Sequence, residues 1–106
     1  MSETLRLVQE LIARNLLRIS EHGYDELAAD GISIEELVEG VTAATVVEDY
    51  PEYFKGPCVL VLQKGFDGKP IHAVWGIARN AKAPAVLVTA YRPKPDKWSS
   101  DFRKRL

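Results

Sequence analysis

The stretch that decides the fold reads Cys58-Val-Leu-Val-Leu-Gln-Lys64, Gly65-Phe-Asp-Gly-Lys-Pro70, Ile71-His-Ala-Val-Trp-Gly-Ile-Ala78 and, after a short polar loop, Ala85-Val-Leu-Val-Thr-Ala-Tyr91. Three of these runs are rich in β-branched and aromatic residues, which favour strands. An Asp-Gly pair joins the first two, and that pair is a strong hairpin signal. We therefore predict an antiparallel meander, which carries His72 where the pattern otherwise asks for an apolar residue.

The chain before the meander is predicted to be helical. Residues 3–16 place apolar side chains at helical spacing, with charged residues on the other side. Ser20 is a suitable N-cap for a second helix over 21–29. Ser33-Ile-Glu-Glu36 has the pattern of a capping box and starts a third helix.

The remaining segments complete the expected domain. Residues 42–48 read as a strand, and 49–57, with two prolines and a glycine, as a surface connection. The C-terminal stretch is predicted to form a short helix or a fraying tail, anchored by Trp98 and Phe102. We expect a single α+β domain with N-terminal helices on one face of a four-stranded antiparallel sheet. Its predicted parts are the helices at about 3–41, the sheet at about 42–92 and the tail at 93–106.

Composition places the chain among ordinary globular proteins. It has 106 residues, of which 46% are hydrophobic and 27% charged. No apolar run approaches the roughly 20 residues of a membrane span, and the N-terminus does not resemble a signal segment. The single cysteine, Cys58, has no internal partner, so we expect a cytoplasmic protein without membrane contact and read this thiol as a small buried hydrophobe.

The net charge of −1 hides an asymmetry between the two halves. Residues 1–54 hold three basic and twelve acidic residues, whereas 55–106 hold eleven basic and three acidic residues. One interpretation is an acidic helical half docked on a basic sheet half. The other is a basic face kept for an anion such as RNA phosphate. The first is favoured because a dedicated nucleic-acid binder usually shows a positive surplus.

Strand alternation gathers polar side chains around His72. With Asp67-Gly68 at the centre of a two-residue turn, Gln63 would face His72 across the hairpin. A four-residue loop over 79–82 would then pair His72 with Thr89. Gln63, Thr89 and Tyr91 would surround His72 on one face, which avoids burying unpaired polar groups singly.

Two readings of this cluster stay open. His72 can act as a general acid or base, with Gln63, Thr89 and Tyr91 as orienting or substrate-binding groups. Alternatively it is a structural histidine whose ring bonds to Thr89 or Tyr91. His22, in the first turn of the second helix, is a second candidate, although a lone histidine there is more often solvated.

Other constellations point to no cofactor. The histidines and their acidic neighbours do not match the spacing of a closed zinc site, so we expect no metal. Glu48, Asp49 and Glu52 form a carboxylate cluster that we interpret as a solvated face. The chain has no phosphate-binding glycine loop and no nucleophile elbow. Trp75 shares its strand face with Ile71 and is predicted to lie in the core.

A family resemblance adds to this reading. Its motifs are Arg18-Ile-Ser-Glu-His22, Gly31-Ile-Ser33 before an acidic helix, the Val-Leu-Val-Leu strand, Gly-Lys-Pro-Ile-His72 and Val-Thr-Ala-Tyr91. In this order they resemble domain of unknown function family 4258, over about residues 18–93. That family is grouped with RelE-like, barnase-and-colicin-like small ribonucleases. The resemblance implies a toxin-type endoribonuclease that needs no metal, often encoded beside an antitoxin with a zinc-finger motif.

Carried over by motif, His22 and His72 would be the base and the acid in some order, and Thr89 and Tyr91 would position the phosphate or a base. Many relatives carry arginines where this chain has Glu26 and Asp30, which removes charge stabilisation from the presumed phosphate site. Cations near His72 in the predicted pairing can substitute: Lys64, Lys69 and Arg92.

Three hypotheses follow. The first is an RNase-like toxin that acts on RNA through His22 and His72. The second, favoured by the acidic replacements, is a non-catalytic module on the same fold that binds an antitoxin-like protein or forms a homodimer. The third is a small-molecule enzyme that uses the same pocket.

Overall fold

A computed structural model of the protein describes residues 2–106 and has an α+β fold. Within these residues there are three α-helices, a short 3-10 helix and a five-stranded mixed sheet. The elements are α1 (Glu3–Ala13), β1 (Leu17–Ile19), α2 (Glu21–Asp30), α3 (Ile34–Gly40), η1 (Val41–Ala43), β2 (Thr45–Tyr50), β3 (Cys58–Lys64), β4 (Pro70–Ile77) and β5 (Ala85–Tyr91). No helix in this range is long and apolar enough to cross a membrane.

The caps predicted at Ser20 and Ser33 are present, and Ser2 caps α1. The Ser2 and Ser20 hydroxyls accept hydrogen bonds from backbone N–H groups of the first turns of α1 and α2. Ser33 and Glu36 form the reciprocal capping box of α3. Helix α1 ends at Ala13, three residues before the predicted end, because Asn15 takes a left-handed conformation (φ 59°) that asparagine tolerates.

Because α1 ends early, the chain forms a strand before α2 that was not predicted from the sequence. Leu17–Ile19 forms β1 and pairs in parallel with Ala85–Leu87 of β5. The strand order is β1-β5-β4-β3-β2. The prediction of a four-stranded, fully antiparallel sheet was therefore wrong, because β1 is a fifth strand at the edge and runs parallel to β5. A three-residue strand between two helices is too short to carry a periodic signal.

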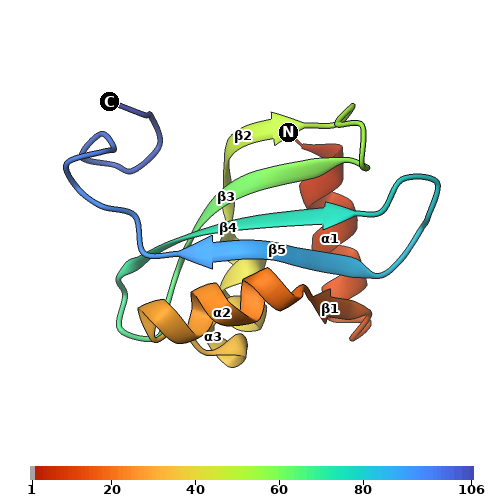
Figure 1. Cartoon of the computed structure of the whole chain (residues 1–106), viewed down its shortest axis with the longest axis horizontal. Helices are drawn as coiled ribbons and strands as arrows, with labels where there is room; N and C mark the ends of the chain where they lie inside the picture. The colour runs from red at the N-terminus through yellow and green to blue at the C-terminus, as the bar shows by residue number, and fades with distance from the viewer. Residues whose placement is uncertain (1) are drawn as a thin grey trace.

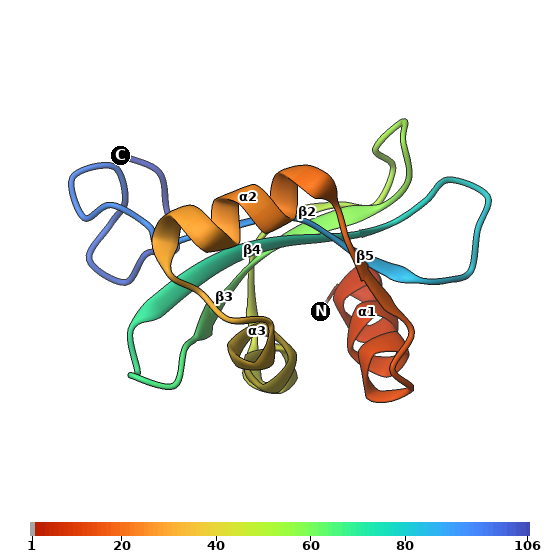
Figure 2. The same ribbon diagram turned by 60° about the horizontal axis from the view of Figure 1, so that its bottom comes forward.

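The helices lie at two different places around the sheet (Figures 1 and 2). Helices α1 and α3 cover one face, which we call the inner face. Helix α2 runs beside β5, where the Ser20 hydroxyl donates to Val88 O over 2.9 Å and Arg92 N donates to Asp30 Oδ2 over 2.8 Å. It therefore covers part of an open strand edge and contributes Leu27 to the core from there, whereas every helix was predicted to lie on the inner face.

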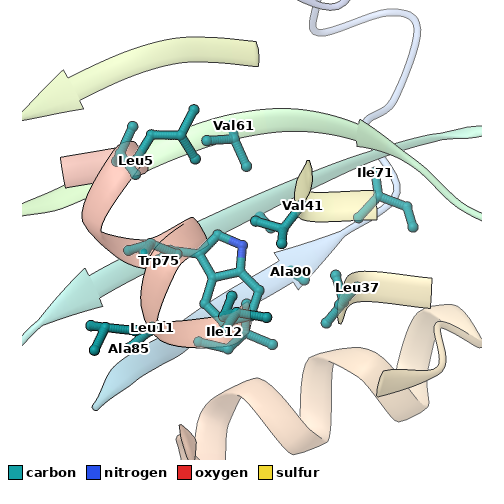
Figure 3. Packing of buried hydrophobic residues seen from close by; sticks show 14 of the residues in the cluster. Leu5, Leu11, Ile12, Leu37, Val41, Val61, Ile71, Trp75, Ala85 and Ala90 are labelled. Atoms are coloured by element: carbon teal, nitrogen blue, oxygen red, sulfur yellow. The ribbon is translucent and has the colours of Figure 1, made fainter. Parts of the chain in front are cut away.

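The core fills the space between α1, α3 and the inner face. Figure 3 shows the indole of Trp75 amid this cluster, as the sequence predicted. Its fully buried members come from helix, 3-10 helix and sheet: Val8, Leu37, Val59, Val61, Ile71, Ala73, Trp75, Ala85, Leu87 and Ala90 are at 0% exposure, with Val41 at 2%. Burial of this apolar surface is the main favourable term in folding.

The β3–β4 hairpin has a different turn from the predicted one. Gly68 N donates to Gly65 O and Gly68 has φ 77°, so Phe66-Asp67-Gly68 is a three-residue loop whose glycine takes the left-handed position. The register is therefore one residue from the prediction, and His72 pairs with Leu62 instead of Gln63. A shift of one residue moves Gln63 to the other face.

The β4–β5 connection is also longer than predicted. Ile77 pairs with Ala85, so residues 78–84 form the loop, and a bulge follows between Val74 and Trp75. His72 consequently pairs with Tyr91, two residues from the predicted Thr89. A shift of two keeps the face unchanged, so Thr89 and Tyr91 do lie on the same side of the sheet as His72.

Candidate functional site

The candidate site lies on the outer face, the side of the sheet opposite α1 and α3. His72 points there because it alternates with Ile71 and Ala73, whose side chains are in the core. The C-terminal tail, residues 93–106, lies at the end of the sheet where β5 ends and β4 begins (Figures 1 and 2). It forms no helix; it folds back on itself through a bridge between Trp98 and Arg105.

The tail encloses His72 completely. The imidazole has 0% exposure, and the Trp98 ring stands edge-on to it with centroids 4.3 Å apart. His72 Nε2 lies 2.8 Å from Phe102 O and Nδ1 lies 3.3 Å from the Tyr91 hydroxyl. A carbonyl oxygen only accepts, so Nε2 carries the hydrogen and the neutral ring accepts from Tyr91 at Nδ1. The hydrogen bond expected for a structural histidine is thus made by Tyr91.

Burial holds this ring in its neutral form. Loss of solvent lowers the pKa of His72, and the hydrogen bond to Phe102 O opposes that shift only in part. The Arg105 charge lowers the pKa further, whereas the Glu48 charge raises it. Burial also raises the pKa of the Tyr91 phenol, which stays protonated. His72 therefore sits among one carboxylate, one guanidinium and one phenol.

Glu48 and Arg105 form an ion pair beside the histidine. Arg105 Nε donates to one Glu48 oxygen over 2.8 Å and Nη2 to the other over 3.0 Å, a bidentate geometry. The Tyr50 hydroxyl donates to the same carboxylate over 3.0 Å. The bond from Arg105 lowers the pKa of Glu48, and the guanidinium also lies 4.8 Å from the Trp98 ring. The pair ties the tail to β2.

These two residues were missed by the sequence interpretation. It assigned Glu48 to a solvated carboxylate cluster with Asp49 and Glu52. In the structure, Glu48 pairs with Leu60 on the outer face after a bulge between Val46 and Glu48, and its side chain is only 25% exposed. The available signal was a basic Arg103-Lys-Arg105 run after Trp98, which the tail brings back over the sheet.

His22 is not part of this cluster. Its side chain is 66% exposed, and Nε2 lies 3.7 Å from Glu26 Oε1, one helical turn away. It belongs to the end of α2 that Ser20 ties to Val88, whereas His72 lies opposite Tyr91. The structure therefore does not bring the two predicted histidines together.

Gln63 is on the inner face, which corrects its predicted place. It pairs with Ile71, is 3% exposed, and donates from Nε2 to Leu37 O over 3.0 Å. Its amide ties β3 to α3 instead of contacting His72. Its Oε1 has no hydrogen-bond partner within residues 2–106.

Of the cations predicted near His72, Arg92 forms ion pairs with two carboxylates instead. Arg92 Nη2 lies 3.7 Å from Asp67 and 3.9 Å from Glu36, at the hairpin end of the sheet. Lys64 pairs with Pro70 at the end of β3 and is exposed, as is Lys69. The cation beside His72 is Arg105. Contacts between the halves, Glu36 with Arg92 and Glu48 with Arg105, agree with mutual neutralisation of the acidic and basic halves.

Two further features bear on chemistry. Burial, and then the Asp49 charge, raise the pKa of the half-buried Cys58 thiol, so it is not a thiolate. Within residues 2–106, no three His, Cys, Asp or Glu side chains are grouped so that they could hold a metal ion.

The comparisons with known proteins agree with one part of the sequence interpretation. Residues 19–92 match the model of the family described as Domain of unknown function (DUF4258). The match ends before the tail that encloses His72 and begins after α1. No curated protein and no solved structure matched the chain. The family model spans well over half of the sequence, and the chain belongs to the DUF4258 family.

Proposed function

We propose that this chain is a metal-independent, endoribonuclease-type domain in which His72 and Glu48 transfer the protons. The observation that carries the proposal is the position of His72 beside Tyr91 and the Glu48–Arg105 pair on the outer face. The resemblance to RelE-like and barnase-and-colicin-like small ribonucleases supports the same activity. Glu48 takes the place first given to His22, because its charge acts on the His72 ring.

The chemistry requires one base, one acid and one cation. The base removes the proton of a ribose 2′-hydroxyl, the 2′-oxygen attacks the phosphorus, and the bond to the 5′-oxygen breaks. The acid protonates that leaving oxygen, which gives a 2′,3′-cyclic phosphate and a 5′-hydroxyl. The ionised Glu48 suits the base, a protonated His72 suits the acid, and Arg105 offsets the charge that develops on the phosphate.

The proposal requires Trp98 and Phe102 to move off His72 while Arg105 keeps its hydrogen bonds to Glu48. His72 has no exposed surface and both ring nitrogens are occupied, so no substrate reaches it while Phe102 and Trp98 cover it. When Trp98 and Phe102 move away, water reaches the ring and its pKa rises toward the ordinary value near 6.5. Nδ1–H then donates to Tyr91, which orients Nε2 toward the open face.

The test is cleavage of a single-stranded RNA in EDTA by the full chain. We expect His72→Gln and Glu48→Gln to lower the cleavage rate about 100-fold or more, since acid–base groups contribute roughly 10²–10⁴. His22→Gln is the matched control and keeps the wild-type rate within about twofold. Equal rates for the wild type and His72→Gln, at equal thermal stability, would contradict the proposal.

One observation favours a second function. The closed tail satisfies both nitrogens of His72, as in a purely structural site, while Tyr53 and Phe54 stay 46% and 66% exposed. On this reading the domain is a non-catalytic module for a homodimer or an antitoxin-like protein. Light scattering and co-purification with the neighbouring gene product test it, and a monomer with no bound partner speaks against it.

A further inference from the structure

A hollow on the outer face lies beside the candidate centre. It has a volume of about 470 Å³, and its floor is formed by side chains of three adjacent strands. A second hollow, of about 340 Å³, shares Tyr53, Cys58 and Val74 with the first and extends to Glu48, Tyr91 and Arg105. The two hollows are therefore neighbours, and the second borders Tyr91 and the Glu48–Arg105 pair.

The floor of the first hollow is apolar and is made of small residues. Val74 and Gly76 on β4 lie between Cys58 on β3 and Val86 on β5. A Cβ at Gly76 would come within 3.2 Å of Pro57 O, so a larger residue there would be forced against the backbone. A planar apolar group fits such a floor better than a charged one does.

The loop between β2 and β3 forms one wall of the first hollow and is held in place. Arg79 N donates to Lys55 O and Ile77 N to Pro57 O, each over 3.0 Å. Gly56 has φ 125°, and a Cβ there would lie 2.1 Å from Ile77 O, so only glycine permits this approach. Tyr53 is therefore presented by an ordered loop, with its ring 46% exposed.

Two cations stand at the rim of the same hollow. Arg18 reaches the outer face because it pairs with Val86, and Lys55 follows Tyr53 in the wall loop. Neither has a carboxylate within 4.0 Å in the part of the chain from residue 2 to 106. An exposed aromatic ring that shares a hollow with two cations lacking a carboxylate partner is an arrangement suited to single-stranded nucleic acid, through base stacking and phosphate contacts.

We infer that this hollow is a nucleotide subsite for single-stranded RNA, in which a base stacks on Tyr53 and its phosphate contacts Arg18 and Lys55. The strand would continue through the second hollow toward Glu48 and His72. The choice of RNA rests on the proposed function, whereas the geometry of the subsite does not. The tail leaves this hollow open, so binding here does not need the tail to lift.

Binding is tested apart from cleavage with a fluorescein-labelled eight-nucleotide RNA in which every ribose is 2′-O-methylated, since such RNA has no 2′-hydroxyl to attack. Fluorescence anisotropy with the full chain gives Kd. We expect Tyr53→Ala to raise Kd about tenfold. Tyr53→Phe should keep most of the wild-type affinity, because stacking needs only the aromatic ring. The duplex of the same sequence is expected to bind more weakly.

The paired variant Arg18→Ala/Lys55→Ala should raise Kd and reduce the slope of log Kd against log salt by about 1.4 units, as expected for two lost phosphate contacts to a single strand. Arg14→Ala/Lys82→Ala removes the same charge outside both hollows and should leave that slope unchanged. The inference is overturned if the wild type does not bind this RNA. It is also overturned if the rim and control variants bind alike, which would indicate non-specific attraction. Retained binding without cleavage of unmodified RNA would instead reject the proposed function alone.

Discussion

At the scale of single residues, the proposed acid–base centre depends on His72. Each nitrogen of its neutral ring has a hydrogen-bond partner, the Tyr91 phenol at Nδ1 and the Phe102 carbonyl at Nε2, which offsets the cost of burying these polar atoms. The same enclosure that lowers its pKa makes protonation of the folded state unfavourable. Protonation therefore couples to the stability of the protein and, in the proposed function, to the position of the tail.

A pH titration of stability tests this coupling. In the unfolded chain His72 binds a proton near pH 6.5, whereas in the folded chain it does so only at lower pH. Between these two values the unfolded state holds more protons, so the free energy of unfolding falls as the pH falls, by at most about 1.4 kcal/mol per pH unit. Urea unfolding between pH 7.5 and 5.5 measures the slope.

His72→Gln should flatten this slope. A wild-type free energy of unfolding that is constant over the same range would show that His72 gains protons equally in both states. That outcome would contradict the enclosure of the ring.

Residue patterns predicted the local structure better than the pairing. The capping residues Ser20 and Ser33 and the strand runs could be read directly, because each depends on neighbours within a few residues. The face of Gln63 could not, since one extra loop residue at Phe66-Asp67-Gly68 reversed it. The faces of Thr89 and Tyr91 were predicted correctly only because the error there was two residues.

At the scale of elements, Glu36 links α3 to the hairpin. Its carboxylate accepts from Ser33 N over 3.0 Å and from Phe66 N over 3.0 Å, and it lies 3.9 Å from Arg92. The bond from Ser33 N contributes most to lowering the pKa of Glu36. A Cβ at Gly65 would meet this carboxylate at very short range, so the hairpin and the helix are closely fitted.

We expect Glu36→Ala to lower the free energy of unfolding by about 2–3 kcal/mol, because hydrogen bonds to a charged, mostly buried acceptor are lost. Glu35→Ala, on the exposed side of the same turn, is the control and should change it by less than about 0.5 kcal/mol. Urea unfolding gives both values. Similar effects of the two substitutions on the free energy of unfolding would show that the hydrogen bonds of the Glu36 carboxylate do not stabilise the fold.

The tail is the second element whose role can be tested directly. Trp98 is 5% exposed and contacts both the His72 ring and the Arg105 guanidinium. Trp98→Ala should loosen the tail, admit water to His72 and raise its pKa toward 6.5, as followed by the imidazole NMR signals. Ser100→Ala, an exposed neighbour, should leave the titration unchanged. An unaltered His72 titration in Trp98→Ala would show that other contacts enclose the ring.

At the scale of the whole molecule, the sequence predicted an α+β chain but not how its ends complete it. β1 adds a parallel strand at the edge of the sheet. The tail follows β5 and returns to β2, where Arg105 forms an ion pair with Glu48. Both depend on contacts between residues far apart in the chain, which short patterns do not encode. For the same reason Glu48 and Arg105, 57 residues apart, could not be recognised as partners from their positions.

The measurement that tests the central claim most directly is RNA cleavage in EDTA by Trp98→Ala and by the double variant Trp98→Ala/His72→Gln. If the tail covers a working acid–base centre, Trp98→Ala should cleave faster than the wild type, and the added His72→Gln should reduce the rate about 100-fold or more. Equal cleavage by the single and double variants, or none by either while both remain folded, would contradict the account.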